Sequence, residues 1–402
     1  MSSPSPKFLI VGAGIIGLTI AKELRKQYPS SSITLLEKES KVGMHASGKN
    51  SGVLHSGIYY GSDTLKAKVC ADGAGRMIAY AHMKNIPVRQ GGKIIIPTKA
   101  SELPVLEKLL AQARSNGINA ELLSAEEIKE VEPAAKPYKQ GIHCPSVAVI
   151  DSKRVLASLE ADLAASGVEL RFDKKVENVL PGERRLSAGD EIFHYDYLIN
   201  CAGAYADQIA RYFDLAQDAE LIPFKGFYYK LNPAKAQLIH SNIYPVPNPA
   251  MPFLGVHFTR VIDDQVYMGP TAVPVLGREN YRGFQGINGS ESAAILKRIC
   301  AMYFTKDASF RNLVHREMWN YLKPYFVAQA KKMVDGIELG DFMACDKAGI
   351  RPQLVNTETQ KLIMDFKVEQ TANSLHILNA ISPAFTSSFA LAEYLVKEKV
   401  SI

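Results

Sequence analysis

The segment KFLIVGAGIIGLTIAKEL near the start of the chain constrains the fold more than any other part of the sequence. Residues 8–11 form a short apolar run of the kind found in a strand buried on both faces of a parallel sheet. Gly12, Gly14 and Gly17 then make a GxGxxG turn, after which apolar residues recur at helical spacing. This order of strand, glycine turn and helix predicts a Rossmann-type α/β unit.

The three glycines and the acidic residue that follows them predict a dinucleotide site. Gly12 permits a tight turn, Gly14 lets the backbone approach a pyrophosphate, and Gly17 allows the helix to pack closely on the strand. The helix N-terminus offers free N–H groups to the phosphates. A second apolar strand, SITLLEK, contains Glu37, about 20 residues after Gly17, where a carboxylate can accept hydrogen bonds from ribose hydroxyls. The expected contacts are Gly12, Gly14, Ile15, Ile16, Gly17, Glu37 and Lys38.

The segment ASGKNSGVLHSGIYY distinguishes between NAD and FAD, the two dinucleotides that this motif binds. A nicotinamide-binding domain usually continues into another βα unit, whereas this segment has neither strand alternation nor a helical stripe. It resembles the flavin-side loop of the D-amino-acid-oxidase-like FAD oxidoreductases. The resemblance implies that Ser47, Asn50 and Ser51 contact FAD and that Gly52 leaves room for backbone near the flavin ring.

Two later segments resemble further FAD-binding parts of the same family. In YDYLINCAGAYADQIA, the resemblance places the turn Cys201–Ala202–Gly203 near the nucleotide. SPAFTSSFALAEYLV begins a last helix whose N-terminus points at the flavin in the family, where the helix dipole favours negative charge on the reduced ring. No linkage motif is present, so the FAD is expected to be non-covalent. The remaining expected cofactor contacts are Val176, at the adenine, with Arg351, Pro383, Ala384, Phe385 and Thr386.

The spacing of these motifs predicts one discontinuous domain and one interrupting domain. At 402 residues the chain is long for a single core. Residues 1–80, 145–215 and 340–402 are expected to assemble a Rossmann-like α/β FAD-binding domain of the glutathione-reductase type. Residues 81–144 and 216–339 contain several strand-like segments and are expected to form an α+β substrate domain built on an antiparallel sheet.

A narrower resemblance, to the L-2-hydroxyglutarate dehydrogenase and oxidase group, rests on the segments NSGVLHSGIYY, LKAKVCADGA, GVHFT, MGPTAV and SPAFTSS. The likeness extends over almost the whole chain, and NSGVLHSGIYY is its most specific element. It implies FAD-dependent oxidation of L-2-hydroxyglutarate to 2-oxoglutarate by hydride transfer to flavin N5. It also implies that the electrons pass to a quinone carrier or to oxygen.

Two histidines are candidates for the base that such an oxidation needs. A neutral imidazole, with an ordinary pKa of about 6.5, suits removal of the hydroxyl proton of a 2-hydroxy acid. His55 lies in the flavin-side loop and is the first candidate; a histidine that only orders this loop is the alternative. His257, in GVHFT, is the second candidate, with a histidine satisfied within its strand as the alternative.

A substrate carboxylate needs a cationic partner. Arg351, in AGIRPQL, matches the arginine that binds the substrate carboxylate in the resembled family, and its planar guanidinium suits bidentate binding. Tyr60 and Lys225 are candidates for the other end of the acid. The family commonly carries arginine and glutamate at the outer positions of Lys225–Gly226–Phe227, so this chain departs from the pattern there.

Composition and charge narrow the remaining classes of function. The net charge of +6 is dispersed, without a block of basic residues, so no nucleic-acid partner is expected. The five cysteines include no CxxC pair, which argues against a zinc site or a disulfide framework. No window approaches the roughly 18 apolar residues of a membrane span, and the N-terminus lacks a signal-peptide pattern. We therefore expect a cytoplasmic protein without a bound metal.

Two other functions and one surface stay open on the sequence alone. A flavin-dependent amine or amino-acid oxidase of the same fold would use Arg351 equally well. A flavin-fold binding or tRNA-handling module without turnover would need a concentrated basic face, which the dispersed charge does not supply. The apolar stripe of EMWNYLKPYFVAQAKKMV, which includes Trp319 and Leu322, suits either peripheral contact with the inner face of a membrane or ordinary domain packing.

Overall fold

The predicted strand, glycine turn and helix open the structure. The computed structural model describes residues 5–249 and 251–401, and in it β1 (Lys7–Val11), α1 (Ile15–Gln27) and β2 (Ser32–Leu36) follow one another. β1 and β2 pair in parallel, and the side chains of residues 8–11 are buried in apolar clusters on the two faces of the sheet. The Rossmann-type unit is therefore confirmed.

This unit lies within a six-stranded sheet whose strands come from distant parts of the chain. The strand order is β20–β21–β13–β1–β2–β9. The added strands are β9 (Glu169–Arg171), β13 (Tyr197–Asn200), β20 (Val368–Thr371) and β21 (Ser374–Ile377). Only the β20–β21 pair is antiparallel. A mostly parallel sheet of this kind needs cover on both faces.

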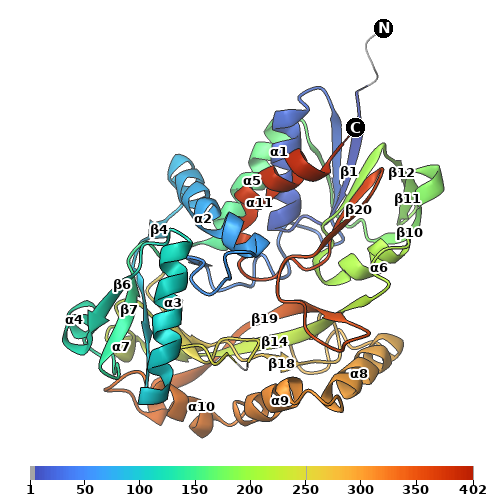
Figure 1. The fold of residues 1–402 in the computed structure, drawn as a ribbon. Helices are drawn as coiled ribbons and strands as arrows, with labels where there is room; N and C mark the ends of the chain where they lie inside the picture. Colours follow the sequence, from blue (N-terminus) through green and yellow to red (C-terminus); the bar gives the residue numbers. More distant parts are fainter. Residues whose placement is uncertain (1–4, 250, 402) are drawn as a thin grey trace.

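Helices cover one face of the six-stranded sheet, and a small antiparallel sheet covers the other. On the first face α1 packs with α5 (Ser152–Ala165) and α11 (Ala384–Lys399), and α11 packs in turn on α2 (Leu65–Met83); these helices stand together in the upper half of Figure 1. On the second face lie α6 (Ala206–Arg211) and the strands β10 (Val176–Leu180), β11 (Arg185–Ala188) and β12 (Glu191–His194).

A larger, mainly antiparallel sheet crosses the lower half of Figure 1. Its order is β18–β14–β17–β16–β15–β5–β7–β6, with β19 paired to β14, and only β5 and β15 run parallel. The strands are β5 (Lys93–Ile96), β6 (Glu121–Ser124), β7 (Gln140–Cys144), β14 (Ala219–Leu231), β15 (Asn242–Pro245), β16 (His257–Arg260), β17 (Val266–Gly269), β18 (Val273–Pro274) and β19 (Phe342–Asn356). The predicted antiparallel substrate sheet is therefore present.

The remaining elements surround the larger sheet or join the two sheets. The helices are α3 (Leu103–Ser115), α4 (Ala125–Val131), α7 (Pro233–Ala236), α8 (Gly289–Tyr303), α9 (Ser309–Trp319) and α10 (Lys323–Ala330). Three short strands, β3 (Val53–Leu54), β4 (Val88–Arg89) and β8 (Ala148–Ile150), form a sheet of their own. β19 belongs to the larger sheet, although the sequence placed it in the third FAD-binding segment, 340–402. We therefore propose that this segment begins after Asn356.

The apolar stripe around α9 and α10 separates into two parts. Phe326, Ala330 and Met333 are buried in the core beneath the larger sheet, which agrees with domain packing. Trp319 and Leu322 are more than half exposed, and a proline in the first turn of α10 separates the two groups. Across residues 5–249 and 251–401, no helix is both long and apolar enough to span a bilayer.

Candidate active site

A cavity of about 2070 Å³ lies where the carboxyl ends of β1, β2 and β13 meet the larger sheet. Its wall runs from the glycine turn and Glu37 to His55, His257 and Arg351. Ligands of open α/β sheets bind at the carboxyl ends of the strands. The cavity therefore joins the predicted dinucleotide site to the predicted reaction site.

The glycine turn at the first end of the cavity fits a pyrophosphate. Gly12 has φ +104°, and a Cβ there would lie 2.4 Å from the Cys201 carbonyl oxygen. A Cβ on Gly17, which supports the turn from outside the cavity wall, would lie 2.0 Å from the Gly12 oxygen. α1 begins without a cap from its own N-cap residue, Gly14, and without an acidic residue in its first turn; Ser47 Oγ accepts from the Ile15 N–H, so the N-terminus carries no negative charge that would oppose an anion. Glu37 is fixed by the Ala13 N–H, which donates to Oε2 at 2.8 Å.

All the other predicted cofactor contacts line this cavity. They come from the glycine turn, the end of β2, the flavin-side loop, β10, the β13–α6 turn, β19 and the start of α11. These residues are Gly12, Gly14, Ile15, Ile16, Glu37, Lys38, Ser47, Asn50, Ser51, Val176, Cys201, Ala202, Gly203, Arg351, Pro383, Ala384, Phe385 and Thr386. Segments far apart in sequence thus surround one elongated space.

The flavin-side loop is ordered by its own small polar residues. Ser47 Oγ accepts a hydrogen bond from the Ile15 N–H at 2.9 Å, and the Asn50 amide donates to the Ser47 carbonyl at 2.7 Å. Gly52 has φ +76°, and a Cβ there would lie 2.6 Å from the Ile150 carbonyl oxygen. The approach of β8, rather than of the flavin ring, therefore requires this glycine, which does not line the cavity.

Arg351 lies at the second end of the cavity with no acidic partner. Its guanidinium carbon lies 4.9 Å from the centre of the Phe253 ring, and it forms no hydrogen bond or ion pair with any residue that the structure describes. Burial lowers the pKa of Arg351, but a guanidinium stays charged in proteins. Arg351 is half-buried in the cavity wall, and a cation so placed without a counter-ion indicates a site for an anionic ligand.

The alternation of β14 corrects the expectation for Lys225. Phe224, Gly226 and Tyr228 line the cavity, so Lys225 and Phe227 face the opposite side of the sheet. The Phe227 ring packs there against α10 rather than near a substrate. The departure from the family pattern at these two positions therefore lies outside the cavity.

The two candidate histidines both line the cavity and are held differently. The ring of His55 makes no hydrogen bond with a described residue, while its backbone N–H donates to Thr386 Oγ1 at 3.2 Å. His257 Nδ1 lies 2.8 Å from the Gly255 carbonyl oxygen, which can only accept, so Nδ1 carries the proton and Nε2 is the acceptor. Burial lowers the pKa of His55 to about 3 and that of His257 to about 4, so both rings are neutral near pH 7.

Comparison with known proteins identifies the family. The family model for FAD-dependent oxidoreductases matches residues 7–398. The chain belongs to the FAD-dependent oxidoreductase family. It is 33% identical to the mitochondrial L-2-hydroxyglutarate dehydrogenase of Mus musculus over 96% of this chain and 87% of that protein. It is also 33% identical to the L-2-hydroxyglutarate dehydrogenase of Indibacter alkaliphilus over 95% of this chain and 96% of that protein.

Solved structures confirm the predicted fold of this FAD-dependent oxidoreductase. FAD-bound L-α-glycerophosphate oxidase from Mycoplasma pneumoniae superposes with a TM-score of 0.75 at 24% identity, covering 98% of this chain and 94% of that one. Glycine oxidase from Geobacillus kaustophilus gives 0.72 at 16% identity, covering 99% and 96%. FAD is accordingly the cofactor of this oxidoreductase, and the glycine turn, Glu37 and the N-terminus of α1 are suited to hold it.

Several residues at the substrate end of this oxidoreductase were missed in the sequence. Tyr59, Tyr228, Tyr244 and Lys66 line the cavity together with the predicted Tyr60. Tyr228 was detectable, because it follows Gly226 at the period of two that defines one face of a strand. The position of Tyr244 in the cavity wall is set by the pairing of β15 with β16, and no local sequence pattern indicates this pairing.

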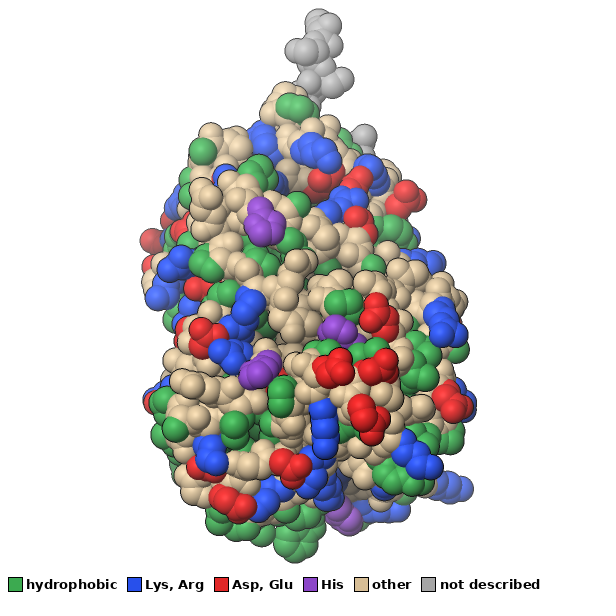
Figure 2. All heavy atoms as spheres, turned by 90° about the vertical axis from the view of Figure 1, so that its left-hand side faces the viewer, with side chains coloured by type: hydrophobic (Ala, Val, Ile, Leu, Met, Phe, Trp, Pro, Cys, Tyr) green, Lys and Arg blue, Asp and Glu red, His purple; other side chains and the backbone are tan. Residues whose placement is uncertain are grey.

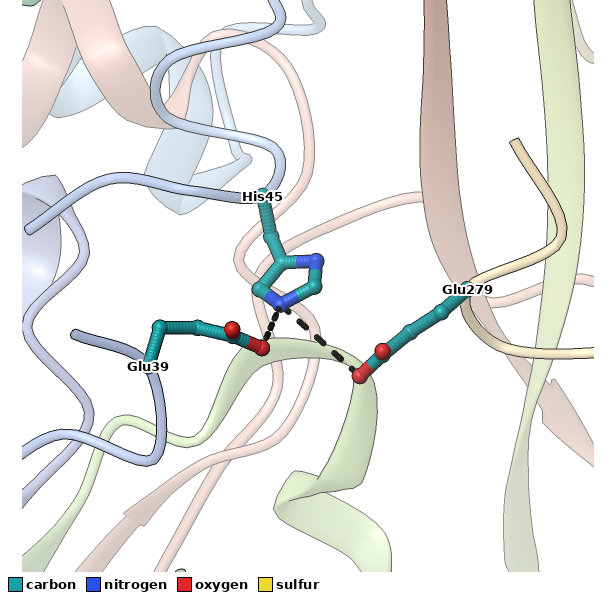
Figure 3. Close-up of side chains that lie close together, drawn as sticks. All are labelled: Glu39, His45 and Glu279. Carbon is teal, nitrogen blue, oxygen red and sulfur yellow. Dashed lines mark hydrogen bonds and ion pairs between the residues drawn. The ribbon is translucent and has the colours of Figure 1, made fainter. Parts of the chain in front are cut away.

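A cluster of Glu39, His45 and Glu279 lies beside the nucleotide end of the cavity (Figure 3). His45 Nε2 is 2.8 Å from Glu39 Oε1 and 3.7 Å from Glu279 Oε1, a spacing that also suits a metal ion. The Lys38 ammonium pairs with both carboxylates, at 2.6 Å from Glu279. Burial opposes its charge, but these hydrogen bonds raise the pKa of Lys38 above its ordinary value. Lys38 therefore supplies the positive charge that a metal ion would otherwise bring to these two carboxylates.

Proposed function

We propose that this chain oxidises L-2-hydroxyglutarate to 2-oxoglutarate with FAD. The observation that carries the proposal is Arg351, a half-buried arginine in the cavity wall that has no acidic partner among the described residues. His55 and His257 lie close enough for its charge to lower their pKa values further, beyond the larger effect of burial. A 2-hydroxy acid supplies both the anion for Arg351 and a hydroxyl proton for a neutral histidine. The relatives named as L-2-hydroxyglutarate dehydrogenases support this choice of acid.

In this proposal Arg351 orients the substrate and His55 accepts its hydroxyl proton. Arg351 binds the carboxylate next to the reacting carbon through its planar fork. That carboxylate brings negative charge near His55, which raises the pKa of the imidazole from its low value in the free protein toward that of a useful base. When bound, FAD supplies the acceptor for the hydride that leaves C2.

His257 and Tyr60 complete the proposed contacts with the substrate. His257 is held by Gly255 with Nε2 as the acceptor, so it is the second candidate for the base. Burial raises the pKa of Tyr60 well above its ordinary value, so the phenol stays protonated and can donate a hydrogen bond. Tyr60 lies near Arg351, whose charge opposes that rise.

We also propose that electrons leave to a quinone carrier or to oxygen, and that an exposed apolar surface touches a membrane. Met318, Trp319, Tyr321 and Leu322 are each more than half exposed at the junction of α9 and α10, next to Lys323. Figure 2 shows apolar side chains at the lower end of one face, the end at which α10 lies in Figure 1, with basic and a few acidic side chains around them. This combination suits an anionic lipid surface.

The test is the absorption spectrum of the purified protein under anaerobic conditions. We expect a flavin spectrum that L-2-hydroxyglutarate bleaches faster than L-lactate or any amino acid. Bleaching by glycine or proline, without bleaching by hydroxyglutarate, would replace the proposal with an amine or amino-acid oxidase. The membrane contact is tested separately by co-sedimentation with anionic vesicles, which the double variant Trp319→Ser/Leu322→Ser should weaken while the flavin spectrum is kept.

A further inference from the structure

A buried lysine at the substrate end of the cavity has no role in the function proposed above. Lys93, on β5, is 1% exposed. Its ammonium lies 4.5 Å from the centre of the Tyr59 ring and 5.1 Å from that of the Tyr244 ring. No carboxylate in residues 5–249 or 251–401 pairs with it, and burial lowers its pKa. Cation–π attraction to two rings offsets only part of the cost of burying such a charge.

The two tyrosines that cover Lys93 carry unused hydrogen-bond donors. Tyr59 and Tyr244 line the cavity, and both hydroxyls are buried without a hydrogen-bond partner within the described part of the chain. The Thr259 hydroxyl opposes the burial-driven rise in the pKa of Tyr244, but the two oxygens form no hydrogen bond of normal geometry. Burial raises the pKa of both phenols, so both stay protonated. Buried donors without a partner indicate that a ligand bound in the cavity supplies the hydrogen-bond acceptor.

The larger sheet places this group beside the histidines, on the same face as the cavity. Lys93 pairs with Asn242 in the β5–β15 register, so Tyr244, two residues further on, points to the same side of the sheet. The Tyr244 ring stacks on His257 with their centres 4.0 Å apart. After burial, the charges of both Lys93 and Arg351 lower the pKa values of His55 and His257. Both histidines therefore lie within reach of two cations, the buried Lys93 and the half-buried Arg351, neither of which has a carboxylate partner among the described residues.

We propose that Tyr59, Tyr244 and Lys93 form the subsite for the second carboxylate of a dicarboxylic 2-hydroxy acid. The inference rests on the proposed function, in which Arg351 binds the carboxylate next to the reacting carbon. The two phenols donate hydrogen bonds to the distal carboxylate, and Lys93 supplies positive charge from behind their rings. An acid with a methyl group in place of that carboxylate leaves these donors unpaired, so the subsite selects dicarboxylates.

The first test measures binding without turnover. The FAD-loaded protein is titrated with glutarate and with pentanoate, which lacks the second carboxylate, and binding is followed by the flavin spectrum and by calorimetry. We expect Lys93→Met, Tyr59→Phe and Tyr244→Phe each to weaken glutarate binding by roughly 10- to 100-fold, since each removes part of a charge-assisted contact. Pentanoate binding should change by less than about 3-fold.

Lys225 provides a matched control. It is also a lysine of the larger sheet, but it faces the side away from the cavity. Lys225→Met should keep the ratio of glutarate to pentanoate affinity. If Lys225→Met removes this preference, or if the three subsite variants weaken both acids equally, the subsite is overturned.

The second test compares turnover of two substrates that differ only at the distal end. The ratio of kcat/KM for L-2-hydroxyglutarate to that for L-2-hydroxypentanoate should fall roughly 10- to 100-fold in the subsite variants. A general loss of folding or of FAD would lower both values together, which would count against the subsite. If no 2-hydroxy acid reduces the wild-type flavin, while glutarate binding still depends on Lys93, the proposed function fails and the dicarboxylate subsite stands.

Discussion

The charged side chains at the two ends of the cavity are partnered in opposite ways. At the nucleotide end, Arg278 holds Asp207 through two hydrogen bonds of 2.6 and 3.0 Å, and Lys38 joins Glu39 to Glu279. At the substrate end, the cations have no acidic partner in the described structure, and two phenols have no acceptor.

The presence or absence of a partner therefore distinguishes charged side chains that stabilise the fold from those that we propose bind a ligand. The pairs at the nucleotide end join the proposed FAD-binding domain, through the loop after β2 and α6, to residues 278–281 of the proposed substrate domain. Each charged side chain of these pairs already has a partner of opposite charge within the protein. An unpaired buried charge costs stability, which a chain tolerates where a ligand will complete the pairing. Substitutions at the two ends should therefore affect different measurements.

The largest effect is expected from His55→Ala, which removes the proposed base. Anaerobic stopped-flow should show flavin reduction slowed by about 100- to 10,000-fold at saturating substrate. Glutarate binding should survive, because the proposed carboxylate sites lie elsewhere. His240→Ala, an exposed histidine away from the cavity, serves as the control. A near-normal rate in His55→Ala would make His257 the next candidate.

A comparable effect on stability rather than on chemistry is expected at the nucleotide end. Asp207→Asn leaves the buried Arg278 with Glu291, 3.2 Å from its Nε, as its remaining carboxylate partner, so the loss in the free energy of unfolding should approach but not exceed the roughly 3–5 kcal/mol of a fully broken buried pair. Urea unfolding of the FAD-loaded protein measures this loss. The preference for dicarboxylic acids should not change; a variant with normal stability and altered preference would contradict the division between the two ends.

Arg351→Lys tests the substrate end by keeping the charge and removing the planar fork. We expect KM to rise by roughly 10- to 100-fold with a smaller change in kcat, since the lost contact acts mainly on binding. A change confined to kcat would instead place Arg351 in the chemical step.

The pH dependence should show that both histidines are neutral in the free protein. An ordinary histidine would produce a rise in kcat/KM near pH 6.5, but burial lowers the pKa values to about 3 and about 4. We expect no histidine ionisation in kcat/KM between about pH 5 and 8. Because the unfolded chain binds these protons first, stability should fall as the pH drops below about 6.5. A bell-shaped profile centred near neutrality would refute this assignment.

The smallest effect is expected from Glu279→Gln in the cluster of Figure 3. Its side chain is 28% exposed, so the pair with Lys38 is screened by solvent and the loss should stay below about 1 kcal/mol. Asp207→Asn is measured in the same urea experiment. The difference between the two losses in the free energy of unfolding shows how strongly burial determines the contribution of an ion pair to stability.

The fold and the residues that line the nucleotide end of the cavity were predictable because their signals are local. Gly12, Gly14 and Gly17 stand close together at the start of α1, and Glu37 directly follows the next strand, so spacing alone indicates a dinucleotide. The start of α11 has no local motif that indicates a cofactor. Its position at the cavity was predictable only from the resemblance to a family of known fold.

The substrate end was less predictable because it depends on pairing between distant strands. Lys225 was selected by charge, but the register of β14 turns it away from the cavity. Lys93 stands in an apolar strand, and only its parallel pairing with β15 brings it beneath Tyr244. Gly52 does admit a close approach, but the neighbour is β8 and not the flavin ring that the resemblance implied.

The place of α11 has a consequence for the biosynthesis of the protein. Its first turn lines the flavin end of the cavity, and the rest of the helix packs on α1 and α2. Translation releases the glycine turn first and α11 after every other described element. We therefore expect that a chain still on the ribosome has the phosphate-binding turn but lacks part of the cavity wall, and that it retains flavin only after α11 has emerged.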